Sequence, residues 1–173
     1  MQEVSVVIPN FNGMAYLDGV LSSLERQTIR NFEVILVDNG STDGSCAFVS
    51  AEYPWVHMIQ LPENYGFSRA VNEGIRAARS PYVLLLNNDT EAEPDFLEEM
   101  VAALRRHKKA FSCQAKMIQL HDRDKMDDAG NYYCALGWAF ARGKGKDIRH
   151  YDREQKIFST CAGAAIYRKK FID

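Results

Sequence analysis

The chain has 173 residues, of which 46% are hydrophobic and 25% are charged, and its formal net charge is −2. This length is ordinary for one domain, and the balanced charge argues against a general nucleic-acid-binding or membrane-binding surface. No apolar run approaches the roughly 20 residues of a membrane-spanning helix, and the four cysteines form no C-x-x-C pair. We therefore expect one soluble, cytoplasmic domain, spanning residues 1–173, with no nucleic-acid partner.

The first 110 residues alternate apolar runs with amphipathic stretches in the order β-α-β-α-β-α-β-α. Strands are predicted at residues 4–8, 32–37, 56–61 and 83–86, and helices at 14–27, 45–52, 68–78 and 94–109. Ser68 is the expected cap of the third helix, and Pro94 suits the first position of the fourth. Apolar strands joined by helices predict the α/β class: a mainly parallel, Rossmann-like sheet with helices on both faces, as an α/β/α sandwich.

After Ala110 the alternation stops. Residues 113–120, 157–160 and 162–167 are predicted strands, and between them residues 122–155 form a polar, Gly-rich stretch with scattered aromatic side chains. A connection this long is usually functional or disordered, and its aromatic residues argue against disorder. The basic residues 168–170 look like the entry to a helix just before the sequence ends, so we expect it to be part of a longer protein.

Three predicted strands end in residues suited to binding a nucleotide. Phe11 follows the first strand, Asp38 the second and Asp89 the fourth. Ligands of open α/β sheets bind outside the carboxyl ends of the strands. There an aromatic ring can contact a nucleobase, and a carboxylate can accept from a base or ribose. A second carboxylate can hold Mg²⁺ or Mn²⁺ against a diphosphate. Taken singly, Phe11 reads as a core residue and both aspartates as turn formers, but together they favour a site.

The sequence lacks the motifs that several other classes of enzyme require. The sequence contains no G-x-x-x-x-G-K-[ST], no G-x-G-x-x-G after the first strand, no G-x-S-x-G and no H-E-x-x-H. The basic run at residues 105–109 is interpreted as the usual complement of a helix C-terminus, not as a nucleic-acid patch.

Four segments resemble, in order and spacing, the family 2 glycosyltransferases, which have the GT-A fold. They are residues 7–13, 35–45, 63–67 with Asn72, and 85–90. The resemblance covers essentially the whole chain and is greatest to the bacterial rhamnosyltransferase-like branch. That branch often carries segments similar to residues 137–145, 151–152 and 161–165.

The resemblance implies transfer of a sugar, with inversion, from a nucleotide diphosphate sugar to a saccharide or lipid-linked acceptor in cell-envelope polysaccharide synthesis. Residues 1–110 would be the nucleotide-sugar-binding half, and residues 111–173 part of the acceptor-side half. Membrane contact would be indirect, through the acceptor or further segments, at the inner face of the membrane. The implied donor-binding residues are Pro9, Asn10, Phe11, Asn12, Asp38, Asn39, Asn64, Gly66, Arg69, Asn88 and Asp89.

Residues 87–89 stand where the family has its D-x-D-type motif, so Asp89 would hold Mg²⁺ or Mn²⁺. The amides at the two preceding positions imply weaker metal binding. The family's general base lies in an E-D-type motif that is absent before Asp173, and neither Asp152 nor Glu154 has that context. We therefore expect the base to lie beyond Asp173, and this chain to bind nucleotide but transfer sugar poorly or not at all.

Two alternatives stay open at this point. A nucleotidyltransferase that makes activated sugars would carry a Gly-rich, basic loop after the first strand, where this chain has residues 10–13, Asn-Phe-Asn-Gly. A non-catalytic domain that binds a nucleotide or a partner protein is the second alternative.

Overall fold

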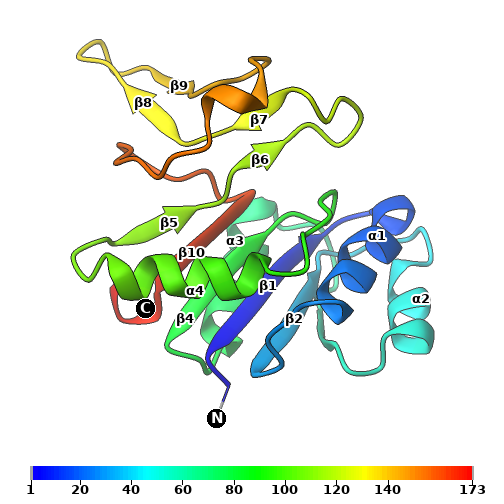
Figure 1. Cartoon of the computed structure of the whole chain (residues 1–173). Coiled ribbons are helices and arrows are strands. Elements are labelled where there is room, and N and C mark those ends of the chain that lie inside the picture. Colours follow the sequence, from blue (N-terminus) through cyan, green and yellow to red (C-terminus); the bar gives the residue numbers. More distant parts are fainter. Residues whose placement is uncertain (1, 173) are drawn as a thin grey trace.

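The structure of the protein, a computed structural model, describes residues 2–172 and builds them around one central sheet (Figure 1). Within the described residues this sheet has six strands in the order β3-β2-β1-β4-β10-β5. The first four strands of the chain are parallel, and β10 runs antiparallel between β4 and β5. The strands are β1 Val4–Asn10, β2 Phe32–Asp38, β3 His57–Gln60, β4 Tyr82–Leu86, β5 Ser112–Gln114 and β10 Ala164–Arg168.

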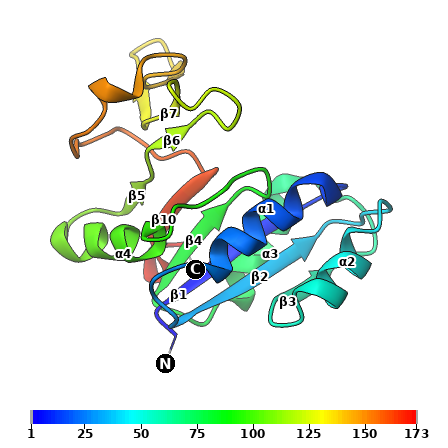
Figure 2. The same ribbon diagram turned by 45° about the vertical axis from the view of Figure 1, so that its right-hand side comes forward.

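Helices cover both faces of the sheet, as Figure 2 shows from a second angle. One face contacts α1 Met14–Glu25, α2 Ser45–Glu52 and α4 Phe96–Arg106, and the other contacts α3 Phe67–Ala77. In β4, Leu84 and Leu86 belong to the first core, and Val83 and Leu85 to the second. Because β4 is buried on both sides, its sequence is continuously apolar instead of alternating. The predicted α/β/α sandwich with a mainly parallel sheet is confirmed.

Two predicted boundaries are wrong, for reasons of packing. The first strand does not stop before Pro9 but continues to Asn10, paired with β2 throughout. Pairing with β4 has ended at Val7, so the ring nitrogen of Pro9, which faces that side, interrupts no ladder bond. Ser68 does not cap α3. The helix begins at Phe67, and Gly66 occupies the N-cap position with φ 86° and no side-chain bond.

The fourth helix also starts later than predicted. Pro94 lies in the turn before α4, where the amide of Phe96 donates to the carbonyl of Glu93 over 3.0 Å. The helix itself spans Phe96–Arg106, and its buried stripe is Leu97, Met100, Val101 and Leu104.

The segment between β5 and β10 forms a small β region beyond the β10–β5 side of the main sheet (Figures 1 and 2). β6 Met117–Ile118 pairs with β7 Met126–Asp128, and β8 Asn131–Tyr133 pairs with β9 Ala139–Ala141. The strands predicted at residues 113–120 and 157–160 are therefore wrong. The first divides between two sheets, and the second makes only a bridge from Ser159 to Asn131. Residues 168–170 lead into a single 3₁₀ turn, Lys169–Phe171.

No helix in residues 2–172 has the length and apolarity needed to cross a bilayer.

Gly74 sets the distance between α3 and β1. A Cβ at this position would lie 2.2 Å from Cγ1 of Val7 and 3.2 Å from Cγ2 of Val37. We expect Gly74→Ala to lower the free energy of unfolding by about 1–3 kcal/mol, measured by urea denaturation, because the core is overpacked. Gly19→Ala in α1 is the matched control. Its Cβ would meet only Glu91 at 3.6 Å, so helix propensity should raise stability by about 0.5–1 kcal/mol. Equal losses in both variants would contradict this packing argument.

Candidate functional site

The carboxyl ends of β1, β2 and β4 meet at one edge of the sheet, because these strands are parallel neighbours. A cleft of about 370 Å³ opens there. It is lined by residues from three strand ends and from the start of α3: Pro9, Asn10, Phe11, Asn39, Asn64, Gly66, Phe67, Ala70, Asn87, Asn88 and Asp89. We call it the strand-end cleft.

The side chain of Asn10 ties the three strand ends together. It is 1% exposed. Its Nδ2 donates to Oδ1 of Asp38 over 2.9 Å, and its Oδ1 accepts from Nδ2 of Asn88 over 2.7 Å. Gly13 leaves the space for this arrangement, because a Cβ there would fall 2.1 Å from Nδ2 of Asn88. The floor of the cleft is thus a buried hydrogen-bond network whose polar groups hold one another in place.

Asp38 lies beneath the cleft and does not line it. It is 2% exposed, and its carboxylate also accepts from the backbone amide of Ser41 over 2.9 Å. Burial by itself raises the pKa of Asp38. The hydrogen bonds from Ser41 and Asn10 outweigh burial and hold the pKa below its ordinary value. Asp38 is therefore a buried anion that fixes the turn after β2 and the orientation of Asn10.

Asn39 forms hydrogen bonds that hold residues 64–66, which form one side of the strand-end cleft. Its Nδ2 donates to Oδ1 of Asn64 over 2.8 Å, and its Oδ1 accepts from the amide of Tyr65 over 3.0 Å. Oδ1 of Asn64 also accepts from the amide of Gly66 over 2.9 Å. The turn before α3 is consequently held against β2 by side-chain amides.

Most of the residues expected to bind the donor line this cleft, and three do not. Besides Asp38, Asn12 lies outside it, with φ 50° and its Oδ1 accepting from the amide of Thr42 over 2.9 Å. Arg69 is exposed and lies over the ring of Tyr65, 4.0 Å from its centroid. The binding roles of all these residues remain predictions.

Two aromatic rings border the strand-end cleft from opposite strand-to-helix connections. Phe11 is 47% exposed and Phe67 is 52% exposed, so neither is a core residue. Phe67 belongs to one of the family-like segments but was not among the expected site residues. Its position directly after Gly66, where the chain turns into α3, was the signal that the sequence offered.

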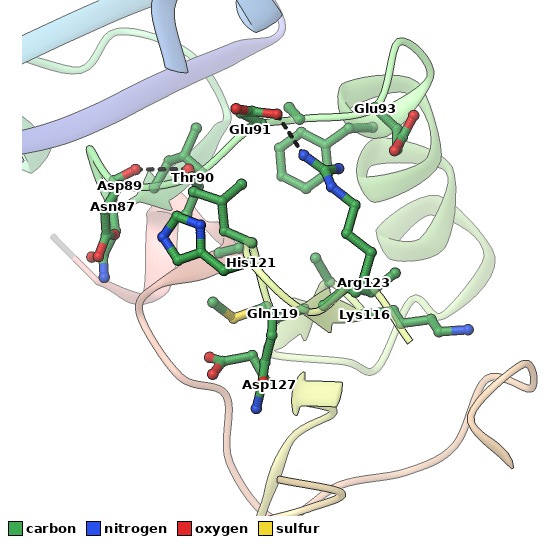
Figure 3. Close-up of a pocket in the computed structure, with 18 of the residues that line it drawn as sticks. Asn87, Asp89, Thr90, Glu91, Glu93, Lys116, Gln119, His121, Arg123 and Asp127 are labelled. Carbon is green, nitrogen blue, oxygen red and sulfur yellow. Dashed lines mark hydrogen bonds and ion pairs between the residues drawn. The ribbon is translucent and has the colours of Figure 1, made fainter. Parts of the chain in front are cut away.

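A second cleft, of about 800 Å³, adjoins the first and shares Asn87 and Asp89 with it (Figure 3). It lies between the residues that follow β4 and the β5–β7 segment. In Figure 3 the guanidinium of Arg123 reaches Glu91, and Nη2 and Oε2 are 2.8 Å apart. Its other charged lining residues are Glu93, Asp95, Glu99, Lys116, Asp122, Asp127 and Lys144, together with His121. We call it the polar cleft. The sequence analysis missed it because its two walls lie some thirty residues apart in the chain.

Asp89 is exposed at the border of the two clefts. Residues 2–172 contain no group of three or more His, Cys, Asp or Glu placed to hold a metal ion. Mg²⁺, however, is usually held in proteins by one or two carboxylates together with substrate phosphates and water. One exposed carboxylate between two clefts fits a cation of this kind, which binds together with a diphosphate.

Comparison with known proteins agrees with this architecture. Residues 5–173 match the family model described as glycosyl transferase family 2. The putative teichuronic acid biosynthesis glycosyltransferase TuaG of Bacillus subtilis (strain 168) is 29% identical over 128 residues, which are 72% of this chain and 50% of TuaG. The putative glycosyltransferase EpsH of the same organism is 34% identical over 101 residues, 57% of this chain and 29% of EpsH.

Solved structures share the fold. S. aureus TarS 1-349 in complex with UDP-GlcNAc superposes with a TM-score of 0.70 at 22% identity, covering 99% of this chain and 46% of TarS 1-349. The mannosyltransferase PcManGT from Pyrobaculum calidifontis, in complex with GDP-Man and Mn²⁺, gives 0.52 at 22% identity. That match covers 68% of this chain and 35% of PcManGT. The chain spans half or less of the length of these four proteins. From its family match and its architecture, the chain belongs to glycosyl transferase family 2 and has the GT-A fold.

Proposed function

We propose that this chain is the nucleotide-sugar-binding part of an inverting glycosyltransferase. It would take a sugar from a nucleotide diphosphate sugar and pass it to a saccharide or lipid-linked acceptor in cell-envelope polysaccharide synthesis. The observation that carries the proposal is the strand-end cleft, where Asn10 joins the ends of β1, β2 and β4 above the buried anion Asp38. The name of TuaG and the UDP-GlcNAc in the TarS complex support it.

In this proposal the strand-end cleft holds the nucleotide. The exposed rings of Phe11 and Phe67 offer apolar faces for the base, and Asn64 and the backbone at Gly66 offer polar groups beside them. Asp89 then lies where the diphosphate passes toward the polar cleft. A Mg²⁺ or Mn²⁺ ion bound there would neutralise the charge of the departing diphosphate. The polar cleft, with its carboxylates and cations, offers hydrogen-bond partners for the hydroxyls of the sugar and acceptor.

The general base is not supplied by Asp152 or Glu154 in this proposal. Nζ of Lys116 donates to Oδ1 of Asp152 over 2.5 Å, and Glu154 pairs with both His107 and Arg106. Hydrogen bonds from His107 and Arg106 hold the pKa of Glu154 below its usual range, which makes its carboxylate a weaker proton acceptor. Neither paired carboxylate is free to take the proton of an acceptor hydroxyl, so in this proposal residues 111–173 contribute to the acceptor side without Asp152 or Glu154 acting as the base.

A thermal-shift panel tests the donor site. The chain is heated with UDP-GlcNAc, GDP-mannose or dTDP-rhamnose, each with and without Mn²⁺. At 100 times its Kd, a ligand that binds only the folded state stabilises it by about 2.7 kcal/mol, which corresponds to roughly 5–10 °C at this size. We expect one donor to give this shift in Mn²⁺ and a smaller one in EDTA. If every donor leaves the Tm unchanged, the cleft does not bind nucleotide sugars. Pyrophosphate release from a nucleoside triphosphate and a sugar phosphate would instead support the nucleotidyltransferase alternative.

A further inference from the structure

The hairpin formed by β8 and β9, residues 131–141, exposes an unusual set of side chains. It contains no charged residue. Its large apolar side chains are more than half exposed: Tyr132, Tyr133, Leu136, Trp138 and Phe140. The ring of Phe158, itself 69% exposed, stacks on Tyr133 with centroids 5.0 Å apart and extends the same surface. We call residues 131–141 with Phe158 the aromatic hairpin. Exposed apolar patches of this kind mark interaction surfaces.

The shape of the aromatic hairpin is convex. The amide of Gly137, at φ 85°, donates to the carbonyl of Cys134 over 3.0 Å, which places Leu136 in the turn with 86% of its surface exposed. Figures 1 and 2 both show the hairpin standing away from the central sheet. None of its residues lines the strand-end cleft or the polar cleft. Sites for small molecules are concave, so this projection suits a broad, deformable surface better than a single sugar or nucleotide.

The segment that follows the hairpin is predominantly positive, whereas residues 122–130 before it contain four Asp against one Arg and one Lys. Residues 142–160 contain six Lys or Arg against three Asp or Glu, although the whole chain has a net charge of −2. Among the described residues, Lys146, Arg153 and Lys156 are exposed and form no ion pair with a carboxylate. Lys156 is two residues from Phe158, and Lys146 follows β9 closely in the chain. An apolar projection that is followed in the chain by unpaired cations is complementary to an anionic bilayer, which offers lipid phosphates above an apolar interior.

We propose that the aromatic hairpin inserts into the headgroup region of an anionic lipid bilayer. Leu136 and Trp138 enter the boundary with the acyl chains, and Lys146, Arg153 and Lys156 contact lipid phosphates. Tyr132, Tyr133 and Phe140 suit the interface, where aromatic side chains are enriched in membrane proteins. This is a direct membrane contact by the chain itself, beyond the indirect one expected from the sequence, and it does not depend on the donor site. A symmetric pair of copies fits less well, because the same positive charges would face one another across the axis.

The chain contains two tryptophans, which makes the test specific. Trp55→Phe leaves Trp138 as the reporter of the hairpin. Trp138→Phe leaves Trp55, which follows α2, at the end of the molecule away from the hairpin, and serves as the matched control. Each variant is mixed with vesicles of phosphatidylcholine alone or with an equal part of phosphatidylglycerol, with or without brominated lipid. We expect Trp138 emission to shift to the blue and to be quenched by bromine only with the anionic vesicles, while Trp55 emission stays unchanged.

Two further variants assign the binding to the named residues. Leu136→Ser with Trp138→Ser should weaken vesicle partitioning more than tenfold, because apolar burial is lost. Replacing Lys146, Arg153 and Lys156 with Gln should weaken it by about 100-fold at low salt, at roughly fivefold for each cation. Both changes are on the surface, and an unchanged far-ultraviolet circular dichroism spectrum shows that the fold is intact. The proposal is overturned if neither vesicle binds the protein, if the Leu136 and Trp138 double variant binds as well as the parent, or if Trp138 is buried in a lipid-free dimer.

Discussion

Replacing Asp89 with asparagine is expected to lower the affinity for the nucleotide diphosphate sugar in Mn²⁺ by about 100-fold. The substitution removes the carboxylate charge at the border of the two clefts and keeps the size of the side chain. A cation held mainly by this carboxylate and by the ligand's phosphates loses its protein anchor. Because Asp89 is exposed and forms no ion pair with any other residue in 2–172, the Tm of the free variant should stay within about 2 °C of the parent.

Isothermal titration calorimetry with donor, in Mn²⁺ and in EDTA, measures this effect. Glu93→Gln is the matched control, since Glu93 lines the polar cleft but not the strand-end cleft and pairs with no cation in the described part of the chain. Its affinity should change less than threefold. The parent should lose affinity in EDTA, and Asp89→Asn should bind equally weakly in both buffers. An Asp89→Asn variant that binds donor as tightly as the parent in Mn²⁺ would remove Asp89 from the proposed site.

Asp38→Ala is expected to lower the free energy of unfolding by about 3 kcal/mol at pH 7. The change removes the charged acceptor of the half-buried amide of Ser41 and of Nδ2 of Asn10, which keeps only Oγ of Ser41 at 3.3 Å, and hydrogen bonds to a charged group are worth roughly 1.5–3 kcal/mol each. Donor binding should weaken as well, because Asn10 is then free to turn away from Asn88. Asp38→Asn keeps the volume but loses the charge, so it should give an intermediate loss. Asp124→Ala, at an exposed carboxylate, should change stability by less than about 0.5 kcal/mol.

The lowered pKa of Asp38 also predicts how the free energy of unfolding depends on pH. The pKa of Asp38 in the folded protein lies below its ordinary value of 3.8, so the folded state binds fewer protons than the unfolded state in that range. The stability contributed by Asp38 is therefore complete above the unfolded pKa and is lost as the pH falls through the folded pKa. Urea titrations of the parent and Asp38→Ala between pH 7 and pH 3 should show a constant difference down to about pH 5 and a shrinking one below. A difference that grows as the pH falls would mean that Asp38 is not held as an anion.

The strands and their edge were predictable because local patterns encode burial. Val83 to Leu86 is continuously apolar since both sides of β4 are covered, and the polar residues that follow it mark where burial ends. Parallel neighbours present their carboxyl ends together, so Phe11 and Asp89 could be placed at one edge from the sequence alone. The resemblance of the surrounding segments to the family then predicted that this edge binds a nucleotide diphosphate sugar and a metal ion.

The network under the cleft could not be predicted, because its partners are far apart in the chain. Asn10 contacts residues 28 and 78 positions away, and nothing in its own neighbourhood distinguishes it from an ordinary turn residue. The division of residues 112–118 between two sheets has a similar origin. β5 pairs with β10 and β6 pairs with β7, although the local apolar pattern predicts one continuous strand. The start of α3 at Phe67, after Gly66, likewise reflects the fit of residues 64–66 against Asn39, which overrides the capping preference of Ser68.

The sequence by itself therefore determined the apolar runs that form the strands of the parallel half and the edge of the sheet at which β1, β2 and β4 end, although not the exact last residue of β1. Both follow from side-chain polarity and periodicity within a few residues. Only the tertiary structure decided that Asp38 lies beneath the cleft with its carboxylate occupied, that the polar cleft exists, and that the aromatic hairpin projects from the molecule. Each of these depends on hydrogen bonds and packing between distant segments, whose energies come into play only once the sheet has brought those segments together.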